Sequence, residues 1–315
     1  MRDLVPNRYP DRDASGLRTA IGREHGVGPR AVFCANGSNE VLQCLLLAYG
    51  GPGRSALVFE PTYALHSHIA RLTSTKTLSA SRGEDFGIDR DSALALIETE
   101  SPDVVFVCSP NNPTGNCETR ETVEAIAAAS EGLVVVDEAY AQFSRWSAVD
   151  LITVHANVAV VRTFSKTWAL AGLRLGYVLA APDVVAACSS AALPYHLDAF
   201  KQVAGLAALR YGAEMKARVA RLVEQRGRIE AGLAALPVDV WPSDANFVLF
   251  RPRGRDAAEV WQGLVERSVL VRDVSGFARL EGCLRVSIGT AEENGRFLAA
   301  LGEILAGGPS VGSVR

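Results

Sequence analysis

Short apolar runs that alternate with helical stretches restrict how this chain can fold more than any other feature. Between the runs, apolar residues recur with the spacing of one helix face, near 64–72, 91–99 and 119–130. Strands that alternate with helices in this way build a largely parallel sheet with helices on both of its faces. The sequence therefore predicts an α/β fold around such a sheet. The runs expected to form its strands lie at 56–59, 104–108, 133–136 and 158–161.

Chain length and a long helical stretch indicate a second, smaller domain. A chain of 315 residues is long enough for two domains, and helical periodicity continues from residue 199 almost to residue 236. Further strands are expected near 246–251, 269–272 and 284–288, and further helices near 256–267 and 291–305. We therefore predict an N-terminal arm at 1–13, a large domain at 14–205 and a smaller α+β domain at 206–315.

Three of the apolar runs lead into residues that carry functional groups. Asn112 lies four residues after one run, Asp137 directly follows the next, and Lys166 lies five residues after the third. Because ligands of parallel α/β sheets bind at the carboxyl ends of the strands, we expect these three residues to converge. Each has an ordinary explanation when taken singly: an Asn-Pro turn, a helix cap, and a solvated surface lysine. Their occurrence at three successive strand ends favours a binding site.

The segment around Lys166 combines an amine with groups that suit a phosphate. A lysine beside an apolar segment loses its proton more easily than an exposed one, and the neutral amine can form a Schiff base with a carbonyl. Thr163 and Ser165 supply hydroxyls, and Arg174 supplies a planar cationic fork. An amine next to a phosphate site suggests pyridoxal phosphate, whose aldehyde and phosphate need these two kinds of partner.

The other two strand ends fit the ring of the same cofactor. A buried carboxylate at Asp137 would keep a pyridine nitrogen protonated, which strengthens the ring as an electron sink. Asn112 and Tyr140 could both hydrogen-bond the phenolic oxygen of the ring. We therefore predict that Lys166, Asp137 and Tyr140 carry the catalysis.

Composition excludes several other classes of protein. A hydrophobic content of 48% and a charged content of 21% are typical of a soluble enzyme, and a net charge of −3 argues against a nucleic-acid partner. No apolar run is long enough to span a membrane, and the first residues lack the apolar core of a signal peptide. The six cysteines are scattered without C-x-x-C spacing, which favours a reduced, cytoplasmic protein. His66 and His68 lie close together but lack a second ligand pair, so no metal site is expected.

Several segments resemble those of a known family. The segments 109–115, 137–140 and 165–174 are similar to those of the class I and II aminotransferases, which have fold type I and bind pyridoxal 5′-phosphate. The resemblance covers nearly the whole chain and is most specific to the histidinol-phosphate aminotransferases. It implies conversion of L-histidinol phosphate and 2-oxoglutarate into imidazole acetol phosphate and L-glutamate, a step of histidine biosynthesis. The strings that carry it lie at 7–11, 37–40, 61–63, 169–174, 193–197, 244–247, 271–273 and 283–286.

The resemblance also implies roles for further residues at the cofactor. Ser38 and Asn39 begin a helical run after a glycine and would bind the phosphate, although a plain helix cap explains them equally well. Tyr63 would stack on the pyridine ring. Tyr9 would reach the phosphate bound by a partner subunit, which implies a homodimer whose active site lies at the interface.

Two arginines are implied to bind the substrate anion. The family uses residues that match Arg285 and Arg272, which would receive the carboxylate of glutamate or 2-oxoglutarate and the phosphate of histidinol phosphate. Two guanidinium groups suit a dianion better than a monoanion. Asn246 and Tyr195 would form part of the wall of the substrate pocket.

The resemblance leaves other activities open. Aromatic amino acid aminotransferases and a phosphothreonine decarboxylase share much of the pattern. A non-catalytic relative should have lost Lys166 or Asp137, and both are present. Family members usually carry a further segment, with an Asn-Glu-Asn-Pro-like motif, ahead of residues that match 7–10. Its lack here leads us to expect either a start codon set too late or a shortened arm with reduced or altered activity.

Overall fold

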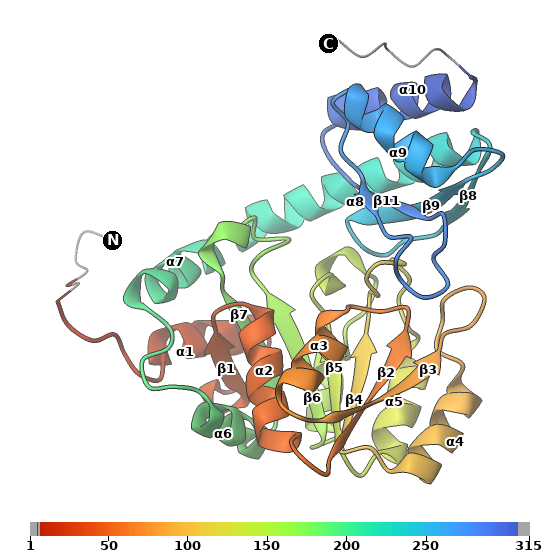
Figure 1. Cartoon of the computed structure of the whole chain (residues 1–315). Helices are drawn as coiled ribbons and strands as arrows, with labels where there is room; N and C mark the ends of the chain where they lie inside the picture. The colour runs from red at the N-terminus through yellow and green to blue at the C-terminus, as the bar shows by residue number, and fades with distance from the viewer. Residues whose placement is uncertain (1–4, 6, 308–315) are drawn as a thin grey trace.

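Two sheets of different size organise the chain (Figure 1). The computed structural model describes residue 5 and residues 7–307. In this part of the chain, a seven-stranded sheet lies in a large α/β unit and a four-stranded sheet in a smaller unit. Residues 1–4 and 6 of the predicted N-terminal arm lie outside the described residues.

The larger sheet has the strand order β1-β7-β6-β5-β4-β2-β3. Its strands from β3 to β6 are parallel, whereas β7 runs antiparallel to both β6 and β1. The four runs expected to form strands are therefore confirmed, and so is the largely parallel sheet. The strands are β1 (Val32–Ala35), β2 (Ser55–Glu60), β3 (Lys76–Ser81), β4 (Val104–Cys108), β5 (Leu133–Asp137), β6 (Val158–Thr163) and β7 (Gly176–Ala180).

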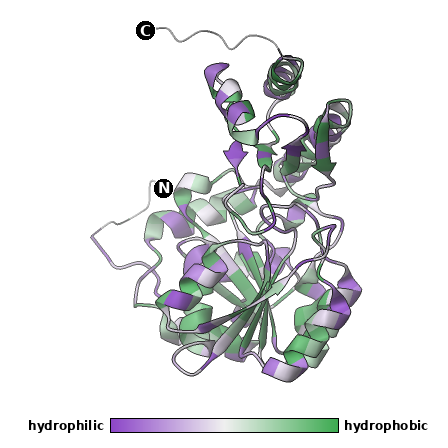
Figure 2. Cartoon of the chain, turned by 45° about the vertical axis from the view of Figure 1, so that its right-hand side comes forward, coloured by the Kyte–Doolittle hydropathy of each residue, from purple (hydrophilic) through white to green (hydrophobic). Residues whose placement is uncertain are grey.

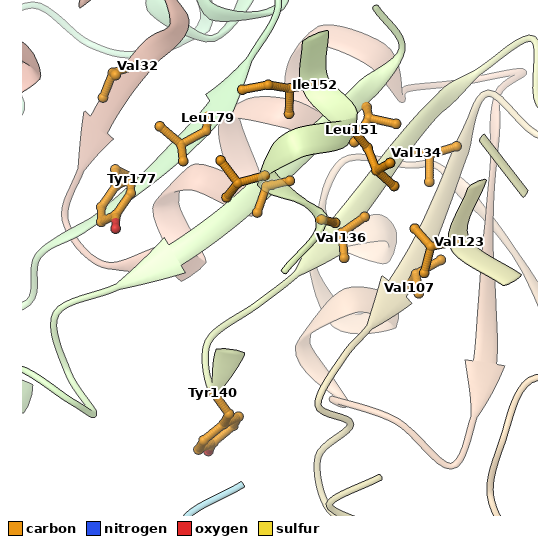
Figure 3. Packing of buried hydrophobic residues seen from close by; sticks show 14 of the residues in the cluster. Val32, Val107, Val123, Val134, Val136, Tyr140, Leu151, Ile152, Tyr177 and Leu179 are labelled. Atoms are coloured by element: carbon orange, nitrogen blue, oxygen red, sulfur yellow. The ribbon is translucent and has the colours of Figure 1, made fainter. Parts of the chain in front are cut away.

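Helices cover both faces of this sheet because its central strands are apolar on both sides. In β5, Val134 and Val136 point into one core, and Leu133 and Val135 point into the other. Figure 2 shows the apolar strands enclosed by helices whose outer surfaces are hydrophilic, and Figure 3 shows Val134 and Val136 packed beside Val107 and Val123. The first core receives α1 (Ser15–Glu24), α4 (Arg90–Glu100) and α5 (Arg120–Ala129), and the second receives α2 (Ser38–Tyr49), α3 (Leu65–Leu72) and α6 (Pro182–Ala191).

The smaller unit is an antiparallel sheet with two helices packed on it. Its strand order is β10-β11-β9-β8, and all of its neighbouring strands are antiparallel. The strand expected near 269–272 is shorter than predicted and begins only at the last residue of that range, since only Arg272 and Asp273 pair. The elements are β8 (Val238–Trp241), β9 (Phe247–Pro252), α9 (Ala257–Glu266), β10 (Arg272–Asp273), β11 (Leu284–Ser287) and α10 (Ala291–Leu305).

Helix α8 (Gly212–Ala234) belongs to both units. Its Met215 and Val219 lie in a core of the large unit, and its Ile229 and Leu233 lie in the core of the smaller one. The expected long helical stretch is broken once, between α7 (Ala199–Leu209) and α8. The domain boundary between 205 and 206 stays a prediction. Short 3₁₀ turns occur at Pro29–Ala31, Ala141–Phe143, Ala148–Thr153 and Ala171–Leu173.

Candidate active site

The carboxyl ends of β4, β5 and β6 open into one cavity of about 260 Å³. Asn112, Asp137 and Lys166 all line it, so the structure brings together the three residues that were expected to converge. Cys108, Ala139 and Ala171 also contribute to its wall. The other predicted site residues that line the same cavity are Ser38, Asn39, Tyr63, Tyr140, Thr163, Ser165, Arg174 and Arg285.

One end of the cavity is formed by the start of α2 and by the segment that follows β6. The guanidinium of Arg174 donates to Ser165 Oγ at 3.2 Å and to the backbone oxygen of Ala171 at 3.1 Å. It lies close against Gly37, where a Cβ would be 2.7 Å from Nη2. Gly176 of β7 lies equally close to the start of α2, because a Cβ at Gly176 would be 2.4 Å from Ser38 N. Backbone N–H groups of a helix start, a hydroxyl and a guanidinium are thus gathered where an anion can bind.

The buried carboxylate of Asp137 is held by a histidine that we had not assigned to the site. His66 Nε2 lies 3.0 Å from Asp137 Oδ2, and Ala139 N donates to Oδ1 at 3.2 Å. The imidazole stacks on Phe106 with ring centroids 4.6 Å apart and planes 6° apart. Its Nδ1 has no partner among the described residues, so a proton on Nε2 serves the carboxylate best. His66 thus fixes the direction in which Asp137 presents its oxygens.

Two tyrosines line the cavity beside this pair. Tyr63 O–H donates to Asn39 Oδ1 at 3.1 Å, and its ring meets His66 edge-on at 5.5 Å. Burial and the nearby Asp137 raise the pKa of Tyr63. Tyr140 is buried, and its burial raises the pKa of its hydroxyl. Both phenols therefore keep their protons at neutral pH and can act as hydrogen-bond donors.

Lys166 lines the cavity and belongs to the segment after β6. Its Nζ lies 5.1 Å from the centre of the Tyr140 ring. Surrounding protein atoms displace water from the amine and lower its pKa, and the positive charges of Arg285 and Arg174 act in the same direction. Asp137 opposes the shift. A lowered pKa enlarges the fraction of neutral amine, which is the nucleophilic form.

Arg285 reaches the cavity from β11 of the smaller unit. Its Nη1 donates to Asn112 Oδ1, and its guanidinium lies 4.6 Å above the ring of Phe247. Its buried Nε has no hydrogen-bond partner among the described residues. Desolvation by burial lowers its pKa, as does the charge of Arg272. A guanidinium with unused donors in the wall of a cavity is suited to a carboxylate or a phosphate.

Four predicted site residues do not line the cavity of the single chain. Arg272 is exposed and pairs with Arg285 across the β10–β11 ladder. Asn246 is partly buried, and its backbone oxygen accepts from Ile288 N. Tyr195 is 43% exposed and stacks on Tyr9, which is 82% exposed. The roles of these four residues stay predictions.

A family model for aminotransferase class I and II matches residues 6–301. The chain belongs to the class I and II aminotransferases. The predicted fold type I, with a large α/β unit and a smaller α+β unit, is confirmed for this aminotransferase.

Two similar proteins are both named histidinol-phosphate aminotransferases. The chain is 49% identical to a histidinol-phosphate aminotransferase of Thermobifida fusca over 300 residues, which is 94% of this chain and 80% of the relative. It is 48% identical to a histidinol-phosphate aminotransferase of Streptomyces avermitilis over 306 residues, 94% of this chain and 82% of the relative.

Solved structures of the family have the same fold. The histidinol-phosphate aminotransferase of Sinorhizobium meliloti, in complex with pyridoxal-5′-phosphate, aligns with a TM-score of 0.88 at 25% identity, over 96% of this chain and 83% of that one. An L-threonine-O-3-phosphate decarboxylase of Porphyromonas gingivalis aligns with a TM-score of 0.84 at 24% identity, over 96% and 91%. The second likeness reflects the shared fold alone.

Proposed function

We propose that this aminotransferase converts L-histidinol phosphate and 2-oxoglutarate into imidazole acetol phosphate and L-glutamate, a step of histidine biosynthesis. The observation that carries the proposal is one cavity that contains Lys166, Asp137 and Arg285 together. The names of the relatives at 48–49% identity support the same substrate. The arginine pair of the β10–β11 ladder supports a substrate with a doubly charged anionic group.

The groups around the cavity fit pyridoxal 5′-phosphate. Ser38, Asn39, Ser165 and Arg174 gather donors and positive charge at one end, which suits the phosphate. A further hydroxyl for that end comes from Thr163, whose Oγ1 also accepts from Ser165 N at 3.1 Å. When bound, the cofactor withdraws electrons from the α-carbon of the substrate.

The other cofactor partners lie around the ring. Asp137 offers a carboxylate, oriented by His66, to a protonated pyridine nitrogen. Tyr63 offers a flat surface for stacking, and Asn112 and Tyr140 offer donors for the phenolic oxygen.

Lys166 supplies the proton chemistry. Its amine would hold the aldehyde of the cofactor and, as a free amine, would take the proton from the substrate α-carbon. The lowered pKa of Lys166 favours this base form near neutral pH. Arg285 orients the substrate by binding its anionic group with donors that Asn112 does not use.

We further propose a cytoplasmic homodimer with the active site at its interface. Exposed apolar and aromatic side chains support a second copy of the chain as partner, and two of them, Tyr9 and Tyr195, stack on each other. Tyr9 would reach the phosphate bound by the partner subunit. The exposed side chains are Val5, Tyr9, Leu193, Tyr195 and Phe200.

All six cysteines, which lie in the described part of the chain, are free, as suits a reducing compartment. None of the described helices is long and apolar enough to cross a membrane, and the described residues contain no cluster of metal-ligand type.

Absorbance spectroscopy of the cofactor-loaded protein tests the substrate. Histidinol phosphate, phenylalanine and phosphothreonine are added in turn, and conversion of the bound cofactor from its pyridoxal to its pyridoxamine form is followed. We expect histidinol phosphate to convert it and 2-oxoglutarate to restore it. Conversion by phenylalanine alone would identify an aromatic aminotransferase. Release of CO₂ from phosphothreonine without an oxo acid would identify a decarboxylase.

A further inference from the structure

The two arginines implied to bind the substrate anion lie on one hairpin that rests on the large unit. Arg272 of β10 and Arg285 of β11 are direct partners in the ladder, and residues 274–283 form the loop between the strands. Val274 and Leu280 of this loop share an apolar cluster with Phe86 of the large unit. Because the loop connects β10 to β11, the contacts of the loop with the large unit also position the two arginines.

Arg279 ties this loop to the large unit through hydrogen bonds. Its Nη1 donates to the backbone oxygen of Arg82, and its Nη2 donates to that of Gly83 at 3.1 Å. The backbone of Arg279 is left-handed, with φ of 64°, and so is that of Phe86 in the large unit, with φ of 65°. Residues with a Cβ adopt this conformation at a cost in free energy, and they keep it only where their surroundings hold them there. The loop and the segment of the large unit that it contacts therefore each contain a residue held in this conformation.

The same large-unit loop is tied to Asn112. Phe86 O accepts from Asn116 Nδ2 at 2.8 Å, and Asn116 O accepts from Asn111 N at 2.7 Å. Asn112 follows Asn111 and accepts from Arg285. The contacts therefore form a closed ring, from the hairpin through Phe86 to the loop of Asn112 and back to the hairpin.

We propose that Arg279 is a positioning residue that holds Arg285 over the cavity when the substrate anion binds. In the described part of the chain, the hydrogen bonds that connect residues 272–287 to the large unit come from Arg279 and Arg285. A substrate anion can use the unpartnered Nε of Arg285 or compete with Asn112 for Nη1, whereas the contact of Arg279 with the large unit does not involve the anion. This inference rests on the proposed function, because it takes Arg285 as the anion-binding residue.

Isothermal titration of the cofactor-loaded protein with 2-oxoglutarate tests the inference. Arg279→Gly removes the side chain and also the conformational cost, since glycine adopts a positive φ freely. We expect it to weaken 2-oxoglutarate binding about tenfold, equivalent to about 1.4 kcal/mol, while thermal stability stays the same or rises. Arg279→Lys keeps the charge but not the fork to two carbonyls, so its binding should be intermediate.

The matched control is Ser268→Gly. Ser268 is an exposed residue of the smaller unit with φ of 57°, so its replacement relieves the same kind of backbone cost away from the hairpin. We expect this variant to bind 2-oxoglutarate like the parent. The absorbance maximum of the bound cofactor should stay unchanged in Arg279→Gly, and in steady-state assays KM should rise while kcat is kept.

Arg285→Lys separates the two ways in which the inference could fail. If Arg285→Lys weakens 2-oxoglutarate binding and Arg279→Gly binds within twofold of the parent, the positioning role is wrong and the proposed function stands. If Arg285→Lys also binds like the parent, the anion site is elsewhere, and both proposals are wrong. A loss of stability in Arg279→Gly that accounts for the whole binding defect would equally overturn the positioning role.

Discussion

Replacing Gly176 with alanine tests whether the contact between β7 and α2 shapes the anion-binding end of the cavity. An added Cβ would lie 2.4 Å from Ser38 N and 2.5 Å from Gly37 C. Ordinary contacts of a Cβ begin at 3.4 Å, so the overlap with Ser38 N is 3.4 − 2.4 = 1.0 Å. Both neighbours are backbone atoms, which cannot rotate away as a side chain can. The start of α2 must therefore move away from β7.

The size of this movement sets the expected effects. Overpacking a well-filled site costs about 1–3 kcal/mol, and we expect the free energy of unfolding of the cofactor-free protein to fall by that amount. A displacement of about 1 Å also misplaces the N–H groups of Ser38 and Asn39 toward a bound phosphate, where one hydrogen bond to a charged group contributes about 1.5–3 kcal/mol. The dissociation constant of pyridoxal phosphate should then rise by about 10- to 150-fold.

Urea unfolding and absorbance titration with pyridoxal phosphate measure the two effects. Gly227→Ala is the matched control, because an added Cβ at this position of α8 meets no atom within 4 Å. It should stabilise the protein by about 0.5–1 kcal/mol and leave cofactor binding unchanged. If Gly176→Ala unfolds at the same urea concentration as the parent and binds the cofactor within twofold, the steric reasoning is refuted.

Three further outcomes are expected. Lys166→Ala should lose covalent attachment of the cofactor, so mass spectrometry after borohydride reduction should find the added mass on the parent only; a labelled variant would exclude Lys166. Burial and Arg162 lower the pKa of His25 to about 4 from 6.5. The unfolded chain therefore binds more protons between these values, and stability is lost as pH falls from 6.5 toward 4. His25→Gln should show a smaller acid loss in urea midpoints, and an unchanged loss would contradict this. His66→Phe keeps a ring on Phe106 but removes the donor to Asp137. The free energy of unfolding should therefore fall by about 1.5–3 kcal/mol, and His66→Gln should recover part of it. If the two variants are equally stable, the hydrogen bond is disproved.

The parallel part of the fold could be predicted because it is encoded locally. Each apolar run is a strand in which every residue is buried or nearly so, and period and composition alone identify it. Parallel strands end at one edge of the sheet, so the predicted order of strands and helices was enough to bring Asn112, Asp137 and Lys166 together. Nothing about their individual neighbours was needed.

Contacts between distant segments could not be predicted in the same way. His66 is one of two histidines of α3, and the carboxylate that it holds lies 71 residues further along the chain. The local signal was its place three residues after Tyr63, but spacing alone does not distinguish a site residue from a core residue. The strand near 269–272 was misplaced for a related reason. The chain leaves α9 through the left-handed Ser268, and pairing begins only where β10 meets β11.

Residues of both units line the cavity, and Arg285 is the lining residue that comes from the smaller unit. The large unit supplies the lysine, the acid and the phosphate end, whereas the smaller unit supplies the guanidinium that would select the substrate. Helix α8 packs into both cores, so the two halves are held in register by apolar contacts rather than by a free linker. If Arg285 binds the substrate anion as proposed, the hydrogen bonds of Asn112 and Arg279 connect its hairpin to the large unit and would influence substrate choice. A substitution in those contacts should change which anions bind before it changes how the cofactor is held.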